Sequence, residues 1–385
     1  MKWGSIIPLI GGFTVAGYQV TNQKPDVILS QPAFASNDSH CLNYFDMEMV
    51  DYTKEVYDKH LDFVVAVPPC SALSSLNCKS CADYESVNFL YDTSRYVLKN
   101  IKPTVLVGEN APGLSQPKGI PVKQRLMEIA EEFGYSFSMF FTTTSLHGIP
   151  QNRQRTFYFF TKNDKAPIHK YYHNIPMPLE DYLGWIPKDA TYQDVYVQKE
   201  QLTDNFFWKF LREELGPDYR QIMHDRNRRS VLSYCRRTDG AFEKLINFLE
   251  REKAPDKVLE KAKYAQQKFN AGGGLWDASP NIFINTINAL QGRLFQAAVH
   301  PLQDRWYNVR EYMHLMGLPH DFQLVNENYG QICQNVPVCT AADMVREATR
   351  IIAGNCDWSK GGYSFTDNTR GLQTTATLDS SSLFF

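Results

Sequence analysis

The sequence predicts an α/β protein with a doubly wound, Rossmann-like sheet and a second, smaller domain. Between residues 5 and 160, short apolar runs that suit buried strands alternate with stretches of helical spacing. Polar or reactive side chains follow several of these runs directly, at the strand ends where open α/β sheets bind ligands. The length of 385 residues exceeds one ordinary hydrophobic core, so we expect one large domain plus a smaller one.

The first predicted unit covers residues 5–17 and consists of an apolar run, a glycine turn and the start of a helix. Such a turn lets a ligand approach the backbone and directs amide groups toward it. The next apolar run, 64–67, ends at Pro68 and Pro69 and is followed by Cys70. A strand here places Cys70 at its carboxyl end, where a nucleophile can act. The alternative is that Cys70 is one more small, buried apolar residue.

The remaining elements of this domain follow in order. Helical spacing predicts a helix over 86–100, and the apolar run 104–107 predicts a strand that leads into Glu109. A second helix fits 121–133, with Pro121 in its first turn and Gly134 at its end. Strands are expected at 137–142 and 156–160, the latter directly after a polar stretch that contains two arginines.

Composition excludes several classes of protein. No apolar run approaches the roughly 18 residues of a membrane span, and no secretory leader opens the chain. We therefore expect an intracellular protein whose eight cysteines are free thiols. Cys78 and Cys81 have the spacing of half a zinc site, but no second pair follows, so two unlinked thiols are favoured and no metal is expected.

Basic residues gather in one place although the net charge is only -2. A stretch without any acid contains Arg226, Arg228, Arg229, Arg236 and Arg237. Phosphate-contacting arginines are what a duplex-binding surface requires. The alternative is a solvated basic face.

Several of these segments together resemble one family. Pro69-Cys70, then Glu109-Asn110, then Gln151, Arg153 and Arg155 stand in the order of the motifs of the DNA (cytosine-5)-methyltransferases. The glycine turn resembles the first motif of that family, and residues 299–322 and 331–337 resemble its last two. The resemblance covers most of the chain. It implies a methyltransferase sheet that uses S-adenosylmethionine, with a target-recognition domain.

The resemblance also implies a division of the chain. Residues 1–185 would form the first part of the catalytic and cofactor-binding domain, and residues 186–280 the target-recognition domain. Residues 281–355 would return to the catalytic domain. From Cys356 to residue 385, we expect a polar, poorly packed tail.

Residue roles follow from the same resemblance. Cys70 would attack carbon 6 of a flipped cytosine, Glu109 would hold N3, and Arg155, with Arg153 as second candidate, would hold O2. The S-adenosylmethionine pocket would comprise Ile10, Gly11, Gly12, Phe13, Asn37, Asp38, Asp51, Pro69, Asn88, Leu90, Gln334, Asn335 and Val336. Ser74, Gln151 and the five arginines named above would contact double-stranded DNA. We expect a monomeric, cytoplasmic protein of bacterial or phage origin, of the kind found in restriction-modification.

The chain departs from the family pattern at the cofactor motifs. Pro8 and Leu9 replace a small residue and the first glycine, Ser36 or Asn37 stands where the family has an acid for the ribose, and Cys333 with Gln334 replaces a Gly-Asn pair. Two alternatives therefore remain: a DNA-binding homologue without activity, and a related enzyme that acts on RNA or uses a modified cofactor. Asp38 also suits a solvated helix cap, and Leu90 a plain core position.

Overall fold

The main feature of the protein is an eight-stranded sheet with the strand order β14-β6-β8-β5-β4-β1-β2-β3. The computed structural model describes residues 1–69, 71–74, 86–187, 195–197, 200–225, 230–273, 279–283, 285–290 and 298–370. The strands of the sheet are β1 (Trp3–Ile6), β2 (Val27–Ser30), β3 (Met49–Asp51), β4 (Phe63–Ala66), β5 (Val105–Asn110), β6 (Ser136–Thr143), β8 (Gln154–Thr161) and β14 (Tyr363–Asp367).

Neighbouring strands of this sheet are parallel, except that β8 runs antiparallel to both β5 and β6. The carboxyl ends of β1, β2, β3, β4 and β5 therefore meet at one edge of the sheet, and the amino end of β8 joins them there. The predicted doubly wound α/β fold is confirmed.

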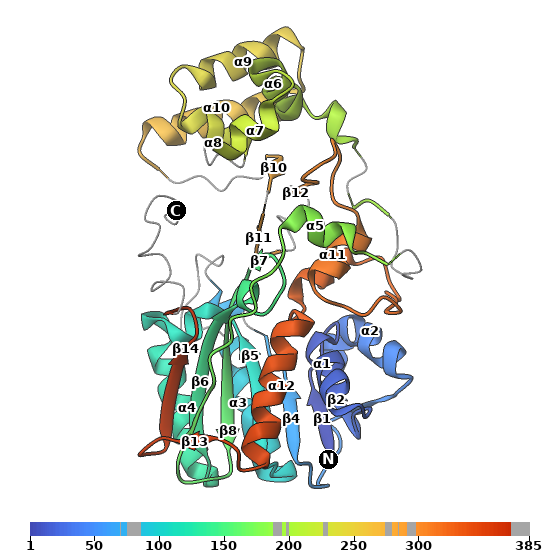
Figure 1. The fold of residues 1–385 in the computed structure, drawn as a ribbon, viewed down its shortest axis with the longest axis vertical. Coiled ribbons are helices and arrows are strands. Elements are labelled where there is room, and N and C mark those ends of the chain that lie inside the picture. The colour runs from blue at the N-terminus through green and yellow to red at the C-terminus, as the bar shows by residue number, and fades with distance from the viewer. Residues whose placement is uncertain are drawn as a thin grey trace.

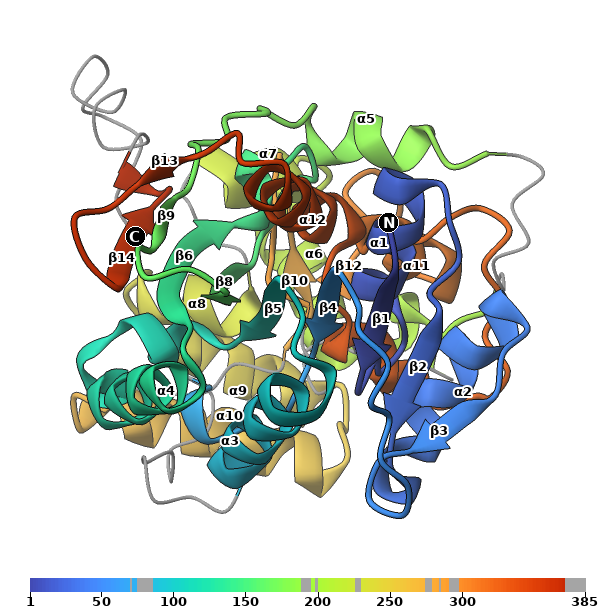
Figure 2. The ribbon, with the colours of Figure 1, turned by 90° about the horizontal axis from the view of Figure 1, so that it is seen from below.

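Helices cover both faces of the sheet (Figures 1 and 2). One face carries α1 (Gly12–Thr21), α2 (Ala35–Phe45) and α12 (Val338–Ile352), and the other carries α3 (Ser86–Tyr96) and α4 (Ile120–Phe133). Side chains of a strand alternate between the two faces, so Val65 packs beneath α1 and α12 whereas Val64 packs beneath α3 and α4. The predicted helices at 86–100 and 121–133 match α3 and α4.

Short elements connect the larger ones. After α3, a turn of π-helix covers Val97–Ile101, and 3-10 turns cover Pro32–Phe34, Ser71–Leu73, Pro112–Ser115, Pro117–Gly119, Thr144–Leu146, Leu202–Asp204 and Tyr329–Gln334. Two-residue strands are β7 (Gln151–Asn152), β9 (Pro167–Ile168), β10 (Asn281–Ile282), β11 (Ile287–Asn288), β12 (Ala298–Val299) and β13 (Asp357–Trp358). Helices α5 (Leu179–Gly184) and α11 (Val309–Leu315) lie between the sheet and the group of helices formed by residues 206–270 (Figure 1).

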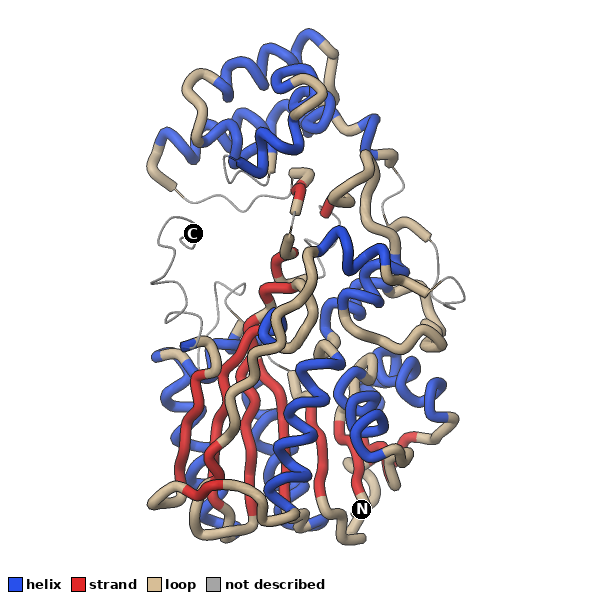
Figure 3. The backbone as a smooth tube through the Cα atoms, in the orientation of Figure 1, coloured by secondary structure: helices blue, strands red, loops and turns tan. Residues whose placement is uncertain are grey.

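A helical lobe stands above the edge of the sheet (Figures 1 and 3). It contains α6 (Phe206–Leu215), α7 (Tyr219–Asp225), α8 (Val231–Arg236), α9 (Ala241–Arg251) and α10 (Asp256–Asn270). Trp208, Leu232 and Leu245 belong to its own hydrophobic core, separate from the two cores that flank the sheet. These helices fall inside the range expected for target recognition, and the boundaries at 186 and 280 stay predictions. No helix in the described ranges has the length and apolar character to cross a membrane.

The segment after Cys356 differs from the poorly packed tail expected of it. Strand β13 pairs with β9, and β14 pairs with β6 along five residues. The buried Asn368 side chain donates to Thr142 Oγ1 at 3.0 Å. Without β14, the backbone groups of β6 would form an exposed edge, which favours pairing of this kind. Residues 371–385 lie outside the described part of the chain.

Candidate active site

The segment that carries the predicted nucleophile leaves the sheet between β4 and β5. Ala66 pairs with Gly108, so the residues that follow β4 lie beside the end of β5. Pro69 is half-buried, and Ser71 begins a 3-10 turn. Cys70 itself lies outside the described residues. Pro69 and Ser71, on either side of it in the sequence, follow the carboxyl end of β4, and the position of Cys70 stays a prediction.

Glu109 and Arg155 meet at this edge. Glu109 is the last residue but one of β5 and is only 3% exposed. Arg155 is the second residue of the antiparallel neighbour β8, and its Nε forms an ion pair with Glu109 Oε1. Arg155 also donates to the Gln154 carbonyl oxygen at 2.7 Å. A guanidinium group is thus held against a buried carboxyl group.

Arg153 takes a different position from Arg155. It lies between β7 and β8, is buried, and donates to the carbonyl oxygens of Leu290 at 3.0 Å and Asn335 at 3.1 Å. Both acceptors are backbone atoms from distant parts of the sequence. Arg153 therefore holds the segments of Leu290 and Asn335 together. Arg155, in contrast, contacts the carboxyl group of Glu109.

The expectation that Gln151 contacts DNA is not met in this structure. Its side chain is fully buried, donates to the Leu315 carbonyl oxygen at 2.9 Å and accepts from the Leu290 amide at 3.3 Å. Both ends of the amide are occupied by backbone, so Gln151 fixes the chain where it returns from the lobe. Ser74, the other DNA candidate near Cys70, is half-buried, and its carbonyl oxygen accepts from Lys118 Nζ at 3.1 Å.

The glycine turn packs tightly against the last motif. Gly12 donates its backbone amide to Asn335 Oδ1 at 2.7 Å, and a Cβ atom at Gly12 would overlap the carbonyl oxygen of Val336. Only glycine allows this approach. Gly11 has a φ of 109°, and Leu9, which stands where the family has a glycine, also adopts a left-handed φ of 53°. The altered motif therefore keeps a left-handed backbone at the substituted position, at a cost in strain.

Most apolar members of the predicted cofactor pocket are buried. Ile10, Phe13 and Val336 are at most 1% exposed, and the Phe13 ring meets Phe157 edge-on with centroids 5.8 Å apart. Leu90, on α3, belongs to the hydrophobic core on the α3 and α4 side of the sheet. This position agrees with the plain core role that was the alternative to cofactor binding.

Asp38 lies in the first turn of α2, yet it is fully buried, which excludes a solvated helix cap. Its Oδ1 accepts the Leu9 amide at 3.0 Å. Burial raises the pKa of Asp38 to about 7, against hydrogen bonds from Ser30 and Leu9 that lower it. Asp38 Oδ2 and Ser30 Oγ are both buried at the end of β2, and apart from the contact between these two side chains neither atom has a hydrogen-bond partner within the described structure.

The other polar candidates are more exposed. Asn37 donates to Gln334 Oε1 at 2.8 Å, so these two predicted cofactor residues contact each other. Asp51 ends β3, and the Thr53 hydroxyl lowers the pKa of its carboxyl group. Asn88 is exposed on α3.

The structure adds one candidate, Gln31, to the cofactor-binding residues that the sequence analysis named. Gln31 follows β2 directly and is half-buried. In nucleotide-binding α/β sheets an acidic residue near a strand end holds the ribose. Ser36 and Asn37, which were aligned with that acid, lie in α2 instead. The sequence contains a signal for Gln31: the short apolar run 27–29 predicts a strand that ends just before this residue.

Of the five predicted DNA-binding arginines, the structure describes two. Arg236 ends α8 and donates to the Gly273 carbonyl oxygen at 2.7 Å, and Arg237 follows it in an exposed position. Arg226, Arg228 and Arg229 lie outside the described residues, as do Cys78 and Cys81. Within the described ranges, no group of three His, Cys, Asp or Glu side chains could hold a metal ion.

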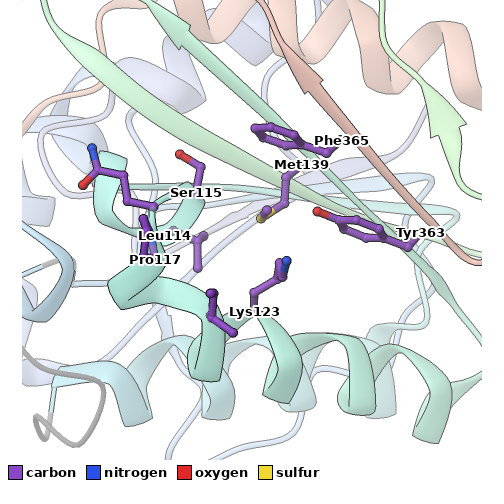
Figure 4. A pocket seen from close by; sticks show the side chains of 9 residues that line it. Leu114, Ser115, Pro117, Lys123, Met139, Tyr363 and Phe365 are labelled. Carbon is purple, nitrogen blue, oxygen red and sulfur yellow. The ribbon is translucent and has the colours of Figure 1, made fainter.

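A separate hollow of about 300 Å³ opens on the α4 side of the sheet (Figure 4). It lies between Ser115, Lys123, Tyr363 and Phe365, and Lys123 Nζ is 5.4 Å from the centre of the Tyr363 ring. The residues around the glycine turn, Ile10 and Phe13, belong to the core on the α1 and α12 side of the sheet. The hollow is therefore separate from the predicted cofactor pocket.

Comparison with known proteins decides the family. The sequence model of the C-5 cytosine-specific DNA methylase family matches residues 31–350. The chain belongs to this family. The resemblance stated from the motifs is thereby confirmed, and membership supports methyltransferase activity and DNA methylation in general.

Individual members of the C-5 cytosine-specific DNA methylase family are only distantly similar. A type II methyltransferase of Bacillus paralicheniformis is 28% identical over 147 residues, which span 33% of this chain and 32% of that protein. One of Neisseria gonorrhoeae is 22% identical over 296 residues, 76% of this chain and 77% of that protein. The structure of the Entamoeba histolytica methyltransferase EhMeth superposes with a TM-score of 0.56 at 10% identity, covering 91% of this chain and 98% of that one. This last likeness shows a shared fold.

Proposed function

We propose that the protein methylates carbon 5 of cytosine in double-stranded DNA and takes the methyl group from S-adenosylmethionine. The observation that carries this proposal is the buried ion pair between Glu109 and Arg155 at the carboxyl edge of the sheet, beside the backbone that flanks Cys70. A carboxyl group and a guanidinium side by side suit the N3 and O2 positions of one cytosine. Membership of the C-5 cytosine-specific DNA methylase family agrees with that substrate.

Carbon 5 of cytosine is a poor nucleophile because it belongs to an aromatic ring. Addition of the Cys70 thiolate forms a bond from sulfur to carbon 6, and the displaced electron pair moves toward N3 and carbon 5. Glu109 holds a proton at N3 and so stabilises the adduct. After carbon 5 has been methylated, loss of its proton and cleavage of the sulfur–carbon bond restore the aromatic ring and free Cys70.

Arg155 has two tasks in this proposal. It holds Glu109 in place and lies where it can donate to O2 of the base, on which negative charge develops. The base must leave the double helix to reach these groups, at a cost of a few kcal/mol. Contacts between the DNA and the helical lobe would offset that cost.

The residues at the ends of β1, β2 and β3 fit an adenosyl group. The buried carboxyl group of Asp38 and the hydroxyl group of Ser30 suit hydrogen bonds with hydroxyl groups of the ligand, and Asp51 suits an amino group. S-adenosylmethionine, when bound, supplies an electrophilic methyl group. The chain itself supplies the left-handed turn at Leu9 and Gly11, which allows close approach to the backbone.

The deciding experiment uses duplex DNA that contains 5-fluorocytosine, incubated with the protein and S-adenosylmethionine. Fluorine at carbon 5 cannot leave as a proton, so the adduct is expected to persist and to shift the protein band in a denaturing gel. The adduct should disappear in Cys70→Ala. Cys356→Ala, which removes a half-buried thiol beyond the end of α12, is the matched control and should retain it.

One observation favours a homologue without activity. Asn37 and Gln334, both expected to meet the methyl donor, hydrogen-bond to each other instead. If calorimetry detects no S-adenosylmethionine binding and no DNA sequence yields an adduct, the homologue without activity is the correct alternative. An adduct on RNA but not on DNA would favour the RNA enzyme.

A further inference from the structure

We propose that the outer edge of β14 pairs with the same strand of a second copy of this chain, so that two sheets join into one across a two-fold axis. The inference is independent of the proposed function, and it replaces the monomer expected from the sequence with a homodimer. It rests on the backbone of β14, on the apolar side chains beside that edge, and on the charges that such pairing brings together.

One row of backbone groups in β14 points away from the sheet. The strand stands at the end of the sheet (Figure 1), and β6 is its neighbour there. The Gly362 carbonyl oxygen and the Asn368 amide both bond to β6, each at 2.8 Å. Because alternate residues of a strand direct their backbone groups to opposite sides, Tyr363, Phe365 and Asp367 direct theirs outward. No other strand in the described ranges pairs with these residues, so the edge is a template for a further strand.

The side chains at this edge favour burial over exposure to water. The strand contains neither proline nor lysine, two residue types that commonly protect an exposed edge. Phe365 is 41% exposed, and Ile120 at the start of α4 is 46% exposed. Both line the hollow on the α4 side of the sheet (Figure 4). A strand added to β14 would remove apolar surface of both residues from water, which stabilises the pairing.

The two-fold symmetry of a homodimer specifies how the strands pair. An antiparallel ladder in which Phe365 faces its own copy also places Tyr363 of each chain opposite Asp367 of the other. All of these residues direct their backbone groups outward. Each pair therefore exchanges two hydrogen bonds, as in the hydrogen-bonded pairs of an antiparallel sheet. The same patch serves both copies, which is the property of a closed two-fold interface.

Self-pairing also brings opposite charges together. Lys123 Nζ lies 5.4 Å from the centre of the Tyr363 ring, and no described carboxyl group forms an ion pair with it. Opposite residues of an antiparallel pair project from the same face of the sheet. Asp367 of the second copy would therefore stand beside Tyr363, within reach of Lys123. Asp367 has only a long ion pair of its own, 3.5 Å from the exposed Arg370.

This arrangement leaves both candidate active sites open. Antiparallel pairing turns the two sheets end for end, so their carboxyl edges face in opposite directions. Glu109 lies in β5, which β8 and β6 separate from β14. Each copy would therefore act on its own substrate molecule. Since β14 lies outside residues 31–350, which the family model matches, the interface is an addition to the part shared with the family.

The first test measures the mass of the full-length protein by sedimentation equilibrium over a range of concentrations. The wild type is expected to reach the mass of two chains. Phe365→Lys would set two like charges opposite each other and should weaken association by about 10-fold or more. Phe365→Tyr, which keeps the ring, should associate like the wild type. The matched control is Val325→Lys, at a 45% exposed apolar residue beside α2, and it should also associate normally.

Two further experiments test the antiparallel register. Cα atoms in a hydrogen-bonded antiparallel pair lie about 5.5 Å apart, a distance that a disulfide spans. Oxidised Phe365→Cys should therefore run as a covalent dimer on a non-reducing gel, unlike the wild type. Lys123→Glu and Asp367→Lys should each weaken association, and the double variant should restore it because the charges are exchanged.

Several results would overturn the inference. A wild type that stays monomeric at every concentration would assign the edge to a different occupant. A dimer that Phe365→Lys leaves unchanged would place the interface elsewhere on the molecule. Absence of the cross-link in Phe365→Cys, or a double charge variant as weak as the single ones, would contradict the antiparallel register. Thermal unfolding verifies that each variant is folded.

Discussion

At the scale of single residues, Gly113 packs closely against the 3-10 turn Ser71–Leu73. A Cβ atom at Gly113 would overlap the carbonyl oxygen of Leu73 and the Lys118 side chain. Lys118 in turn donates to Ser74, so the loop after β5 holds the backbone that follows Cys70. Gly113→Ala must displace this backbone. Because small misplacements of reacting groups cost up to about 100-fold in rate, we expect adduct formation to slow by about 10- to 100-fold.

The matched control for Gly113→Ala is Gly184→Ala at the end of α5. A Cβ atom at Gly184 would meet nothing within 4 Å, so the rate should stay at the wild-type value. Rates come from single-turnover assays, and thermal unfolding verifies the fold. A folded Gly113→Ala protein with a normal rate would contradict the role given to this packing.

At the scale of elements, α12 is held to the sheet by buried polar contacts. Asp343 Oδ2 lies 2.7 Å from His147 Nδ1, and one helical turn later Glu347 Oε2 lies 3.3 Å from His169 Nδ1. Arg350 also donates to Glu347 at 2.6 Å. Burial raises the pKa of Glu347, but hydrogen bonds from His169 and Arg350 outweigh it, so the pKa is about 2. Burial lowers the pKa of His169.

These shifts predict a pH dependence of stability. Both pKa values are lower in the folded state than the ordinary values of 6.5 for histidine and 4.5 for glutamate. The unfolded state therefore binds protons first as the pH falls. The free energy of unfolding should be highest above pH 6.5 and should decrease below it, and the contribution of Glu347 should disappear between pH 4.5 and about 2. Urea titrations at a series of pH values measure this decrease.

Glu347→Gln tests whether the Glu347 carboxyl group causes the predicted loss of stability at low pH. Removing one partner of a buried pair should cost about 3 to 5 kcal/mol at pH 7, and the difference from the wild type should shrink toward pH 2. Glu128→Gln on the exposed side of α4, where the carboxylate pairs with Arg125 at the surface, should change little at any pH. Equal effects of the two variants would contradict this explanation.

At the scale of the whole molecule, Asp304 holds α6 and α7 to the segment that runs from the lobe into α11. It accepts from Arg220 at 2.6 Å and from the Tyr219 hydroxyl, and Arg212 lies 3.2 Å away. Arg220 also donates to the carbonyl oxygens of His300 and Pro301. These contacts connect α6 and α7 to the chain that leads into α11. Because this segment continues into α11, which packs with the core of the sheet domain, we expect the contacts to help orient the lobe relative to the sheet.

Asp304→Asn should therefore loosen the lobe without altering the sheet. We expect KM for duplex DNA to rise several-fold, while the affinity for S-adenosylmethionine measured by calorimetry stays constant. Asp239→Asn, at an exposed position after α8, is the control and should change neither quantity. A reduced cofactor affinity in Asp304→Asn would show that the contacts act on the sheet domain instead.

A second connection, through Arg153, links three segments that are far apart in the sequence. Its guanidinium contacts Leu290 from the returning chain and Asn335 from the last motif, and Asn335 accepts the Gly12 amide of the glycine turn. Nothing in the local sequence distinguishes Arg153 from Arg155. Their separation requires knowledge of which distant backbone atoms lie beside each one.

The local pattern of the sequence by itself determined the sheet and the polar residues at its carboxyl edge. Short apolar runs bounded by proline, glycine or polar residues suit buried strands, and the residues that follow parallel strands share one edge of the sheet. Glu109 and the flanks of Cys70 lie there for that reason. Tertiary structure alone decided which distant partners meet: Arg155 with Glu109, Leu9 with Asp38, and β14 with β6. Such contacts join residues far apart in the chain, and their geometry depends on how helices and strands pack, which no local pattern contains.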